Sequence, residues 1–470
     1  MKIRAAAFLI LGGLVLTGCK VGPDFTAPKP ALPGDWVGTS QPSPPAGVAP
    51  RAGDLRRWWT RLQDPTLDGL VEAALKANLS MASAEASLRQ ARAVRGIAAG
   101  GLWPSVTATA AVQRQQGPQY RTGGGAATLF QAGLDATWEL DLFGGVRRGV
   151  ESADAEVLAA QENLWDVQVS ITAEVALDYI QLRGYQQQIV TARNNLEIQQ
   201  HTVDITRKLY QVGFDSGLDL ANAQSTLAST EAQIPVYETG ARQSIYALSV
   251  LLAQPPGYLL ERLSPTADLP VLSGEIPAGL PSDLVRRRPD IRMAEAQLHS
   301  ATAQIGVAVA QLFPQFSLTG DLGWVSTQSG AWLKKSSRSF SVGPTASWSI
   351  FQGGAAVSNI RQQEALRDNA LIAYQQSVLG ALQDVENALT ALGGEQAHCR
   401  SLGAAVAADH KAVDLSLKLF REGQTDFLTV ITAQRTLYAD DSALAQSRQN
   451  LGTDLVALFK ALGGGWDPES

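Results

Sequence analysis

The chain contains an internal duplication, and this repeat constrains its fold more than any other feature of the sequence. Three separated segments recur later in the chain, each shifted by the same number of positions. Residues 84–88 recur at 294–298, residues 102–104 at 312–314, and residues 223–227 at 433–437. We therefore expect two copies of one unit of about 200 residues. The copies are predicted at 64–252 and 282–462, with a divergent linker at 253–281.

Each copy is expected to contain a helix, a β-hairpin, a very long helix and a final helix. The first helix is predicted over 65–100, and the hairpins over 103–143 and 313–351. Apolar and polar residues alternate along all four strand segments, which is the pattern of strands with one apolar face. The apolar positions are Val106, Ala108, Ala110 and Val112; Leu134, Ala136, Trp138, Leu140 and Leu142; Phe316, Leu318, Leu322 and Trp324; and Phe340, Val342, Ala346, Trp348 and Ile350.

These strands suit a membrane better than the alternative, a half-buried sheet of a soluble protein. Their length of roughly 10–14 residues exceeds the usual 5–6 and crosses a bilayer at a tilt. Their apolar faces end in aromatic residues, as membrane girdles do. The girdle candidates are Trp138, Phe143, Trp324, Phe340 and Trp348. Four strands cannot close a barrel, and an open sheet edge is not viable in lipid. Several copies must therefore contribute four strands each: a dimer would give eight, and a trimer twelve.

A very long helix is expected after each hairpin. No Pro occurs over 146–212 or over 355–422, and ~65–70 helical residues span roughly 100 Å. Gly213 and Gly423 are predicted to cap these helices, and Pro235 to kink the returning helix of copy one. The second long helix has the three-and-four spacing of a coiled-coil seam. The seam is Leu371, Tyr374, Val378, Ala381, Val385, Ala388 and Leu392, continued by Cys399, Leu402 and Val406.

The N-terminus has the pattern of a bacterial export signal. Two basic residues precede an uncharged apolar run at 5–16, which leads through small residues to Cys19. A Cys in this position resembles the lipobox of lipoproteins, in which the Cys is acylated and becomes the first residue. We expect 1–18 to be removed, Cys19 to be the lipidation site, and 19–63 to form a lipidated tether. Lys20 favours delivery to the outer membrane. An ordinary signal peptide with a chance Cys is the alternative.

Composition and motifs argue against several classes of function. The net charge of −6 argues against a nucleic-acid binder, which needs a basic surface. The four His are scattered, and only Cys399 would remain as a free thiol, predicted to be a buried structural residue on the helix seam. The chain has no zinc-protease, CxxC, phosphate-loop or serine-hydrolase motif. We therefore expect no catalytic residue, no metal and no cofactor, and not an enzyme.

Several short motifs resemble those of the TolC-like outer-membrane efflux family, in its lipoprotein branch (NodT/OprM-like) that serves RND-type pumps. The resemblance covers essentially the whole mature chain. The motifs are the run from Cys19 to Pro28, Trp58-Trp59 followed by Asp64-Pro65, Leu140 to Gly144, Arg287 to Ile291, and Lys460 to Trp466.

The resemblance implies a mixed α and membrane-β fold, in which a homotrimer builds one 12-stranded barrel on an α-helical periplasmic tunnel. It places an equatorial belt in the linker and the segments near the termini, with a tail at 463–470. The implied partners are a periplasmic adaptor, an inner-membrane RND-type transporter and outer-membrane lipid. The implied function is that of an exit duct for small toxic compounds, with selection of the compound largely in the inner-membrane partner.

The resemblance also implies a periplasmic gate in the segment 420–437. Leu428 matches the hydrophobic plug and Arg435 the gate arginine, whereas Thr432 stands where an aspartate is usual. Phe420 replaces a tyrosine, and Asp219 of copy one matches an aspartate that ties the inner helices together. Asp426 is expected to restore part of the acidity. The expected gate is closed by Leu428 packing and by Arg435 or Asp219 contacts, with solvated surface charges as the alternative reading of those two residues.

Two other functions are compatible with parts of the sequence. A type I protein-secretion duct would share the fold, although the lipobox and the 287–291 motif favour small-molecule efflux. A structural coiled-coil lipoprotein would account for Cys19 and the helix seam, but not for four amphipathic strands.

Overall fold

The computed structural model describes residues 19–40, 44–49, 51, 53–116, 126–270 and 275–466. The predicted signal peptide at 1–18, the Gly-rich hairpin tip at 117–125 and the last four residues of the predicted tail lie outside the described residues. The chain divides into two compact units, here named the sheet unit and the helix unit. The sheet unit takes the residues up to Lys29, 86–161 and 293–376, and the helix unit takes 30–85, 162–292 and 377 onwards.

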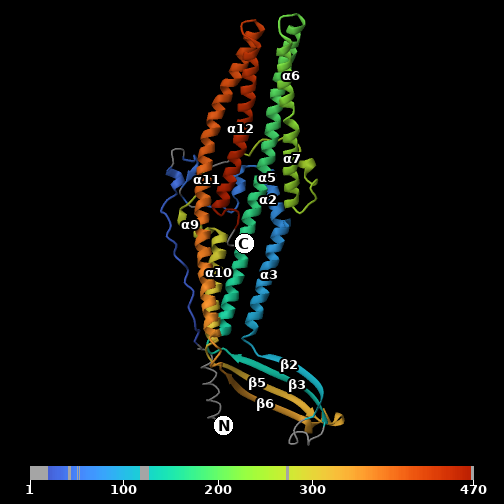
Figure 1. Ribbon diagram of the computed structural model, residues 1–470, viewed down its shortest axis with the longest axis vertical. Helices are drawn as coiled ribbons and strands as arrows, with labels where there is room; N and C mark the ends of the chain where they lie inside the picture. Colours follow the sequence, from blue (N-terminus) through green and yellow to red (C-terminus); the bar gives the residue numbers. More distant parts are fainter. Residues whose placement is uncertain are drawn as a thin grey trace. The chain divides into compact units, whose positions relative to one another are not determined.

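The order of elements repeats along the chain (Figure 1). In sequence the elements are η2 (Val37–Ser40), β1 (Val48–Ala49), η3 (Trp58–Leu62), α2 (Pro65–Ala77), α3 (Leu79–Gly100), β2 (Ser105–Gln116), β3 (Ala126–Leu140), α5 (Gly145–Gln211), α6 (Gly217–Glu231), α7 (Ile234–Leu251), α8 (Leu260–Leu263), β4 (Ile276–Pro277), α9 (Pro281–Arg287), α10 (Pro289–Ala310), β5 (Gln315–Ser326), η4 (Ser329–Ala331), η5 (Lys335–Ser337), β6 (Arg338–Ser347), α11 (Ala355–Arg421) and α12 (Phe427–Ala461). The elements α10, β5 and α11 begin at 289, 315 and 355, each 210 residues after α3, β2 and α5 at 79, 105 and 145.

The sheet unit contains a four-stranded antiparallel sheet in the order β2-β3-β5-β6 (Figure 1). The four strands have 12, 15, 12 and 10 residues, as the long alternating segments predicted. The predicted ends were too long at three residues. Leu142 lies beyond β3, because its N–H turns back to the Leu140 carbonyl at 2.7 Å. Trp348 and Ile350 lie beyond β6, whose last paired residue, Ser347, faces the start of β5.

The strand register places the apolar residues of all four strands on one face of the sheet. Ala108 pairs with Leu134, Leu134 with Leu322, and Leu322 with Phe340. Phe340 is 78% exposed and Leu322 53%. The opposite face is polar: Asp135 pairs with Asp321, and each accepts a hydroxyl hydrogen bond, from Thr109 at 2.9 Å and from Ser341. The sheet is thus two-sided, and the described part of the chain leaves its apolar face exposed.

The helix predicted over 65–100 is two helices, so that prediction was wrong at Asn78. Asn78 has extended backbone angles (φ −61°, ψ 133°) and ends α2. Its Oδ1 then accepts a hydrogen bond from the Ser80 N–H at 2.8 Å, and its Nδ2 donates to the Leu251 carbonyl at 2.9 Å. An Asn side chain that binds nearby backbone groups competes with the helical hydrogen bonds. Here the side chain caps the start of α3 and binds the last residue of α7, while the Asn78 N–H closes α2 on the Ala74 carbonyl.

The two long helices form as predicted. Helices α5 and α11 each have 67 residues, and Gly213 and Gly423 follow them with φ of +76° and +72°. Left-handed angles of this kind favour glycine at a helix C-terminus. The returning helix of copy one is broken into α6 and α7, with Pro235 in the first turn of α7. Helix α12 runs unbroken for 35 residues.

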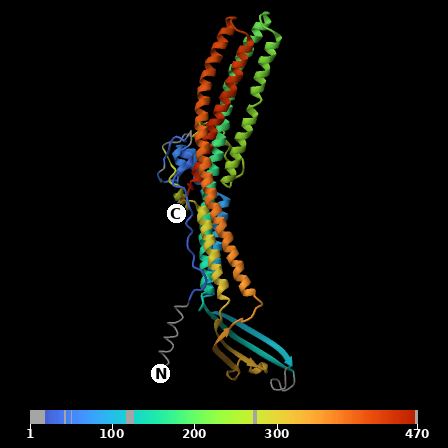
Figure 2. The ribbon, with the colours of Figure 1, turned by 60° about the vertical axis from the view of Figure 1, so that its left-hand side comes forward.

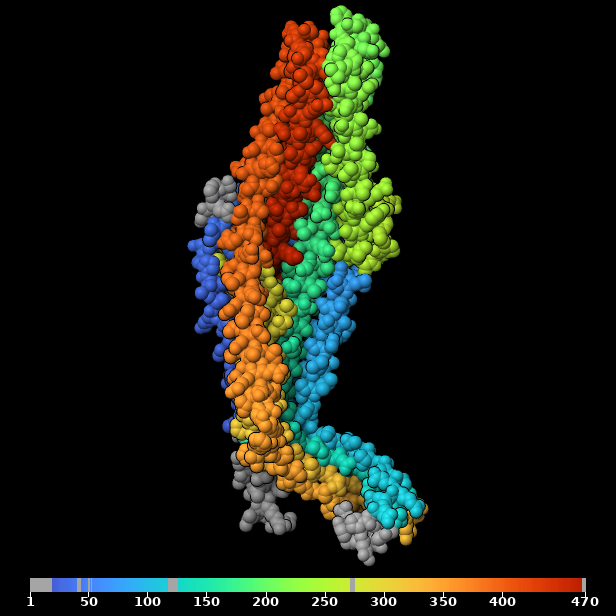
Figure 3. Space-filling model, in the orientation of Figure 1, coloured from blue at the N-terminus to red at the C-terminus, as the bar shows by residue number. Residues whose placement is uncertain are grey.

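Within the helix unit, α11 and α12 lie side by side in both ribbon views (Figure 1 and Figure 2), and their side chains form a continuous surface in Figure 3. The predicted seam of α11 is buried from Tyr374 to Leu392, whereas Leu371 is half-buried. Farther along, Val406 packs with Leu437 and Leu444 of α12, and Cys399 is half-buried against the same cluster. Among the described residues, no helix is both long enough and apolar enough to cross a membrane.

Candidate functional site

The predicted girdle residues lie at both ends of the strands in the sheet unit. Trp138 and Trp348 mark the end next to the helices, and their indole N–H groups donate to the carbonyls of Leu102 and Leu312, both at 3.0 Å. These two bonds are equivalent in the two copies. Phe143 lies at the same end and stacks on Phe313, with ring centroids 4.5 Å apart.

The other two girdle residues, Trp324 and Phe340, lie toward the distal ends of β5 and β6. Trp138 pairs with Leu318, which precedes Trp324 by six positions on β5. Six strand residues span roughly 20 Å. We name Trp138, Phe143 and Trp348 the proximal aromatic row, and Trp324 and Phe340 the distal row.

Three predicted gate residues share one exposed face of α12 in the helix unit. Leu428, Thr432 and Arg435 are spaced by four and three positions, which aligns side chains on a helix. All three are exposed, and Leu428 is 67% exposed. Leu428 is thus an exposed leucine next to polar residues on this face of α12.

Arg435 has a partner that the sequence did not predict. Its Nε and Nη2 donate to the Thr226 hydroxyl of α6 at 3.1 and 3.0 Å. The pair borders a cavity of about 450 Å³ that Tyr237 and Tyr438 also line. Burial, together with Tyr237, raises the pKa of Tyr438 to about 12. Within its own chain, the Arg435 guanidinium therefore binds the Thr226 hydroxyl rather than the Asp219 carboxylate.

The two acidic gate candidates lie at the starts of helices. Asp426 is the N-cap of α12 and accepts hydrogen bonds from the N–H and hydroxyl of Thr429 at 3.0 and 2.7 Å. Asp219 lies in the first turn of α6, where the Ser216 hydroxyl donates to its carboxylate at 2.5 Å and accepts from its N–H at 3.1 Å. Both carboxylates are thus engaged locally.

Phe420 is a core residue in this structure. Its side chain is buried in an apolar cluster of the helix unit and meets Phe427 edge-on, with ring centroids 5.9 Å apart. A tyrosine hydroxyl would have to find a partner inside this cluster. Phenylalanine in place of the usual tyrosine therefore suits the apolar surroundings of residue 420.

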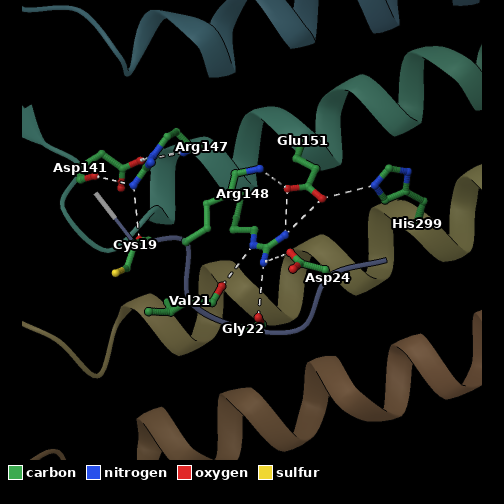
Figure 4. A network of polar contacts seen from close by, with 10 residues as sticks. Cys19, Val21, Gly22, Asp24, Asp141, Arg147, Arg148, Glu151 and His299 are labelled. Carbon is green, nitrogen blue, oxygen red and sulfur yellow. Dashed lines mark hydrogen bonds and ion pairs between the residues drawn. The ribbon is translucent and has the colours of Figure 1, made fainter. Parts of the chain in front are cut away.

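Cys19 is exposed in the sheet unit, and the residues after it lie against α5 and α10 (Figure 4). The Cys19 carbonyl accepts a hydrogen bond from Arg147 Nη2 at 3.3 Å, and the Val21 N–H donates to the Phe143 carbonyl at 3.1 Å. Arg148 is 1% exposed and binds Asp24 at 2.7 Å and Glu151 at 2.9 Å. Nothing in the sequence indicated this arrangement, because Arg148 and Asp24 are 124 positions apart.

Electrostatics support the charged form of this cluster. Burial raises the pKa of Glu151, but hydrogen bonds from Lys20, His299 and Arg148 outweigh it, so the pKa lies below its usual range. Burial lowers the pKa of Arg148, and its bonds to Asp24 and Glu151 raise it above the usual value. His299, a scattered polar residue in the sequence, donates from Nε2 to the Glu151 carboxylate at 3.3 Å.

The remaining motifs meet in the helix unit. The Trp466 indole donates to the Arg287 carbonyl at 3.1 Å and stacks on Trp165, and Arg292 lies 5.2 Å from both rings. Arg288 joins Asp290, Asp384 and the Ala461 carbonyl. These contacts connect the 287–291 and 460–466 motifs, which lie far apart in the sequence.

Two other motifs act in the same way. Trp58 stacks on Phe459 at 4.8 Å in the helix unit, and Asp64 caps α2 while it accepts a hydrogen bond from the Tyr179 hydroxyl at 2.5 Å. In the sheet unit, Asp141 accepts hydrogen bonds from the N–H groups of Val146 and Arg147 at the start of α5. The short sequence motifs thus form contacts that connect helices and strands to one another. Within the described chain, no group of three His, Cys, Asp or Glu residues is placed to hold a metal ion.

Comparisons with known proteins agree with this architecture. The profile of the family described as outer membrane efflux protein matches the chain twice, over 70–254 and 280–464. Nodulation protein T of Rhizobium leguminosarum bv. viciae is 32% identical over 460 residues, covering 96% of this chain and 92% of that protein. The pyoverdine export outer membrane protein OpmQ of Pseudomonas aeruginosa is 31% identical over 89% of each chain.

A solved structure of the outer-membrane channel OprN superposes with a TM-score of 0.90 at 38% sequence identity, over 96% of this chain and all of that one. The relatives are described as channels and export proteins of the outer membrane, not as enzymes. With both copies matched by the family profile and nearly full-length relatives, this chain belongs to the outer membrane efflux protein family.

Proposed function

We propose that three copies of this chain assemble into an outer-membrane exit duct, each contributing its four strands to one 12-stranded barrel. The observation that carries the proposal is the four-stranded sheet, which among the described residues has an exposed apolar face and two edge strands without a further partner, β2 and β6. In lipid every backbone group must be paired, so β2 of one copy has to meet β6 of the next. The polar face, with Asp135 and Asp321, would then line the pore.

The aromatic rows give the apolar band a height suited to a bilayer. Trp348, one residue beyond the Ser347–Gln315 pair, lies ten register positions from Trp324. Six to ten strand residues between the rows, at a tilt of about 45°, correspond to roughly 15–25 Å along the membrane normal. An outward apolar band of about 25 Å flanked by aromatic girdles is typical of such barrels.

The proposed duct receives small toxic compounds from an inner-membrane RND-type transporter through a periplasmic adaptor and conducts them passively. The turn after α5 supplies an apolar docking surface for that adaptor, since Val212, Phe214 and Leu218 are all more than half exposed. In the equivalent turn after α11, Glu422 and Gln424 stand in place of Val212 and Phe214, and Leu428 is exposed. Relatives of this chain include outer membrane components of toluene and antibiotic efflux pumps.

The proposed gate is formed by the exposed face of α12, with Leu428 as plug and Arg435 held on Thr226. Thr432 lies between them, and the capped carboxylates of Asp219 and Asp426 do not converge on an acidic ring. Removal of residues 1–18 and acylation of Cys19 would anchor the N-terminus, leaving 19–63 as tether, 253–281 as equatorial linker and 463–470 as tail.

A deletion strain tests this function directly. Loss of the chain should increase the sensitivity of the cell to several toxic small compounds, and expression of the wild-type chain should restore resistance. Cells should also accumulate a fluorescent pump substrate until the chain is supplied. A strain that keeps its resistance but loses the export of a protein would instead identify a secretion duct.

A further inference from the structure

We propose that Arg148 is the positioning residue for the N-terminal anchor, because it binds the segment 20–25 and holds Cys19 next to the end of β3. The Arg148 side chain is 1% exposed. It donates to the Val21 carbonyl at 3.1 Å, the Gly22 carbonyl at 3.3 Å and the Asp24 carboxylate at 2.7 Å, and Glu151 takes the remaining contacts (Figure 4). A buried guanidinium is costly unless its donors are satisfied, and three of these acceptors belong to the segment.

The surface under this segment is shaped for its main chain. Gly22 has φ of +86°, and a Cβ at this position would lie 2.5 Å from the Cα of Gly306 on α10. Gly144 has φ of +79°, and a Cβ there would lie 2.9 Å from the Cα of Lys20. At both points backbone passes against backbone at a distance that only glycine permits. The fit is therefore specific to this segment rather than a chance contact of a loose tether.

Side chains on both sides of Arg148 extend the docking. Lys20 Nζ pairs with Glu151 at 2.7 Å, and the Phe25 ring stacks on His299 with centroids 4.4 Å apart. The backbone of Val21 is bonded to Phe143 of the proximal aromatic row. Acyl chains on Cys19 would therefore enter the lipid at the level of that row. Only this last step rests on the proposed acylation; the docking of 20–25 does not.

Limited digestion with trypsin measures the docking, because the Lys20–Val21 bond lies inside the docked segment. Cleavage there removes the anchor and leaves a chain that begins at Val21, which N-terminal sequencing and mass detect whether or not Cys19 is acylated. The intact protein in detergent should resist this cut. Arg148→Ala should accelerate it on the order of tenfold, since charge-assisted hydrogen bonds are lost and cleavage follows the open population. Arg148→Lys should restore part of the protection.

Two further variants separate loss of the docking from a general loss of stability. Asp24→Asn removes the negative charge that faces Arg148. Because the Asp24 side chain is 85% exposed, the variant should accelerate the cut without changing the thermal stability of the assembled protein. Arg95→Ala breaks a separate ion pair with Asp154 of α5, 2.8 Å long and half exposed, and should leave the cleavage rate unchanged. Equal rates in wild type, Arg148→Ala and Asp24→Asn would overturn the proposal. If Arg148→Ala does not assemble, Asp24→Asn decides.

The mass of the uncut chain reports separately on acylation. If the chain carries no acyl group but the Lys20–Val21 bond still resists trypsin, the docking proposal stands and the acylation of Cys19 is rejected. Loss of protection in an acylated chain with intact transport would reject the docking alone. The two proposals therefore fail independently.

Discussion

Helices α6 and α12 follow the turns after the two long helices, and each begins with a hydroxyl residue paired with a carboxylate. The two residue types occupy opposite positions in the two copies. In copy one a serine, Ser216, caps the helix and an acid, Asp219, follows it; in copy two an acid, Asp426, is the cap and a hydroxyl residue, Thr429, follows. The same hydroxyl–carboxylate contact forms in both. Because these carboxylates stabilise helix ends, the exposed face of α12 is left with an apolar and a cationic side chain. Divalent cations should therefore block the pore weakly.

The gate residues make a prediction at this scale. Leu428→Ala or Arg435→Ala should raise the single-channel conductance in planar bilayers, because the first removes the plug and the second releases α12 from Thr226. Leu415→Ala, which truncates an equally exposed leucine on α11, is the matched control and should conduct as wild type. The gate assignment is wrong if both α12 variants conduct as wild type while a substitution of an acidic residue elsewhere opens the pore.

At the scale of elements, the C-terminal motif closes the helix unit over the start of α10. Trp466 joins α5 through Trp165 and α10 through Arg292, and it follows a run of glycines in which Gly463 and Gly465 have φ of +70° and +107°. These left-handed angles turn the chain back after α12, where an ordinary residue would be strained. The motif thus acts as a latch between elements of both copies.

Truncation of the latch gives the second prediction. Trp466→Ala should destabilise the helix unit by about 3–5 kcal/mol, the usual cost of removing a buried tryptophan side chain. Thermal unfolding of the protein in detergent measures the effect. Trp466→Phe is the control, because it keeps the stack and loses only the bond to the Arg287 carbonyl, which is worth about 1 kcal/mol. An equal loss in both variants would mean that the hydrogen bond, not the stacking, holds the tail.

At the scale of the whole molecule, the proposed assembly pairs the edge strands β2 and β6 of neighbouring copies. The third prediction is that the solubilised protein has about three times the 49.9 kDa mass of one chain, after correction for bound detergent and for the cleaved signal. Light scattering with refractive-index detection measures it. A proline on β2, Thr109→Pro, removes a ladder donor and should lower the yield of assembled protein. A stable monomer that still forms pores would contradict the shared barrel.

The sequence by itself determined the order and type of the main helices and strands, which depend on neighbours along the chain. Period-two alternation predicted all four strands, the absence of Pro predicted both long helices, and Gly213 and Gly423 predicted their ends, because φ preferences and side-chain periodicity are local properties. Tertiary structure decided the rest. Asn78, Arg148 and Trp466 bind partners 173, 124 and 179 positions away. A buried charge or indole is stabilised by groups that only folding brings together, so no local pattern in the sequence predicts its partners.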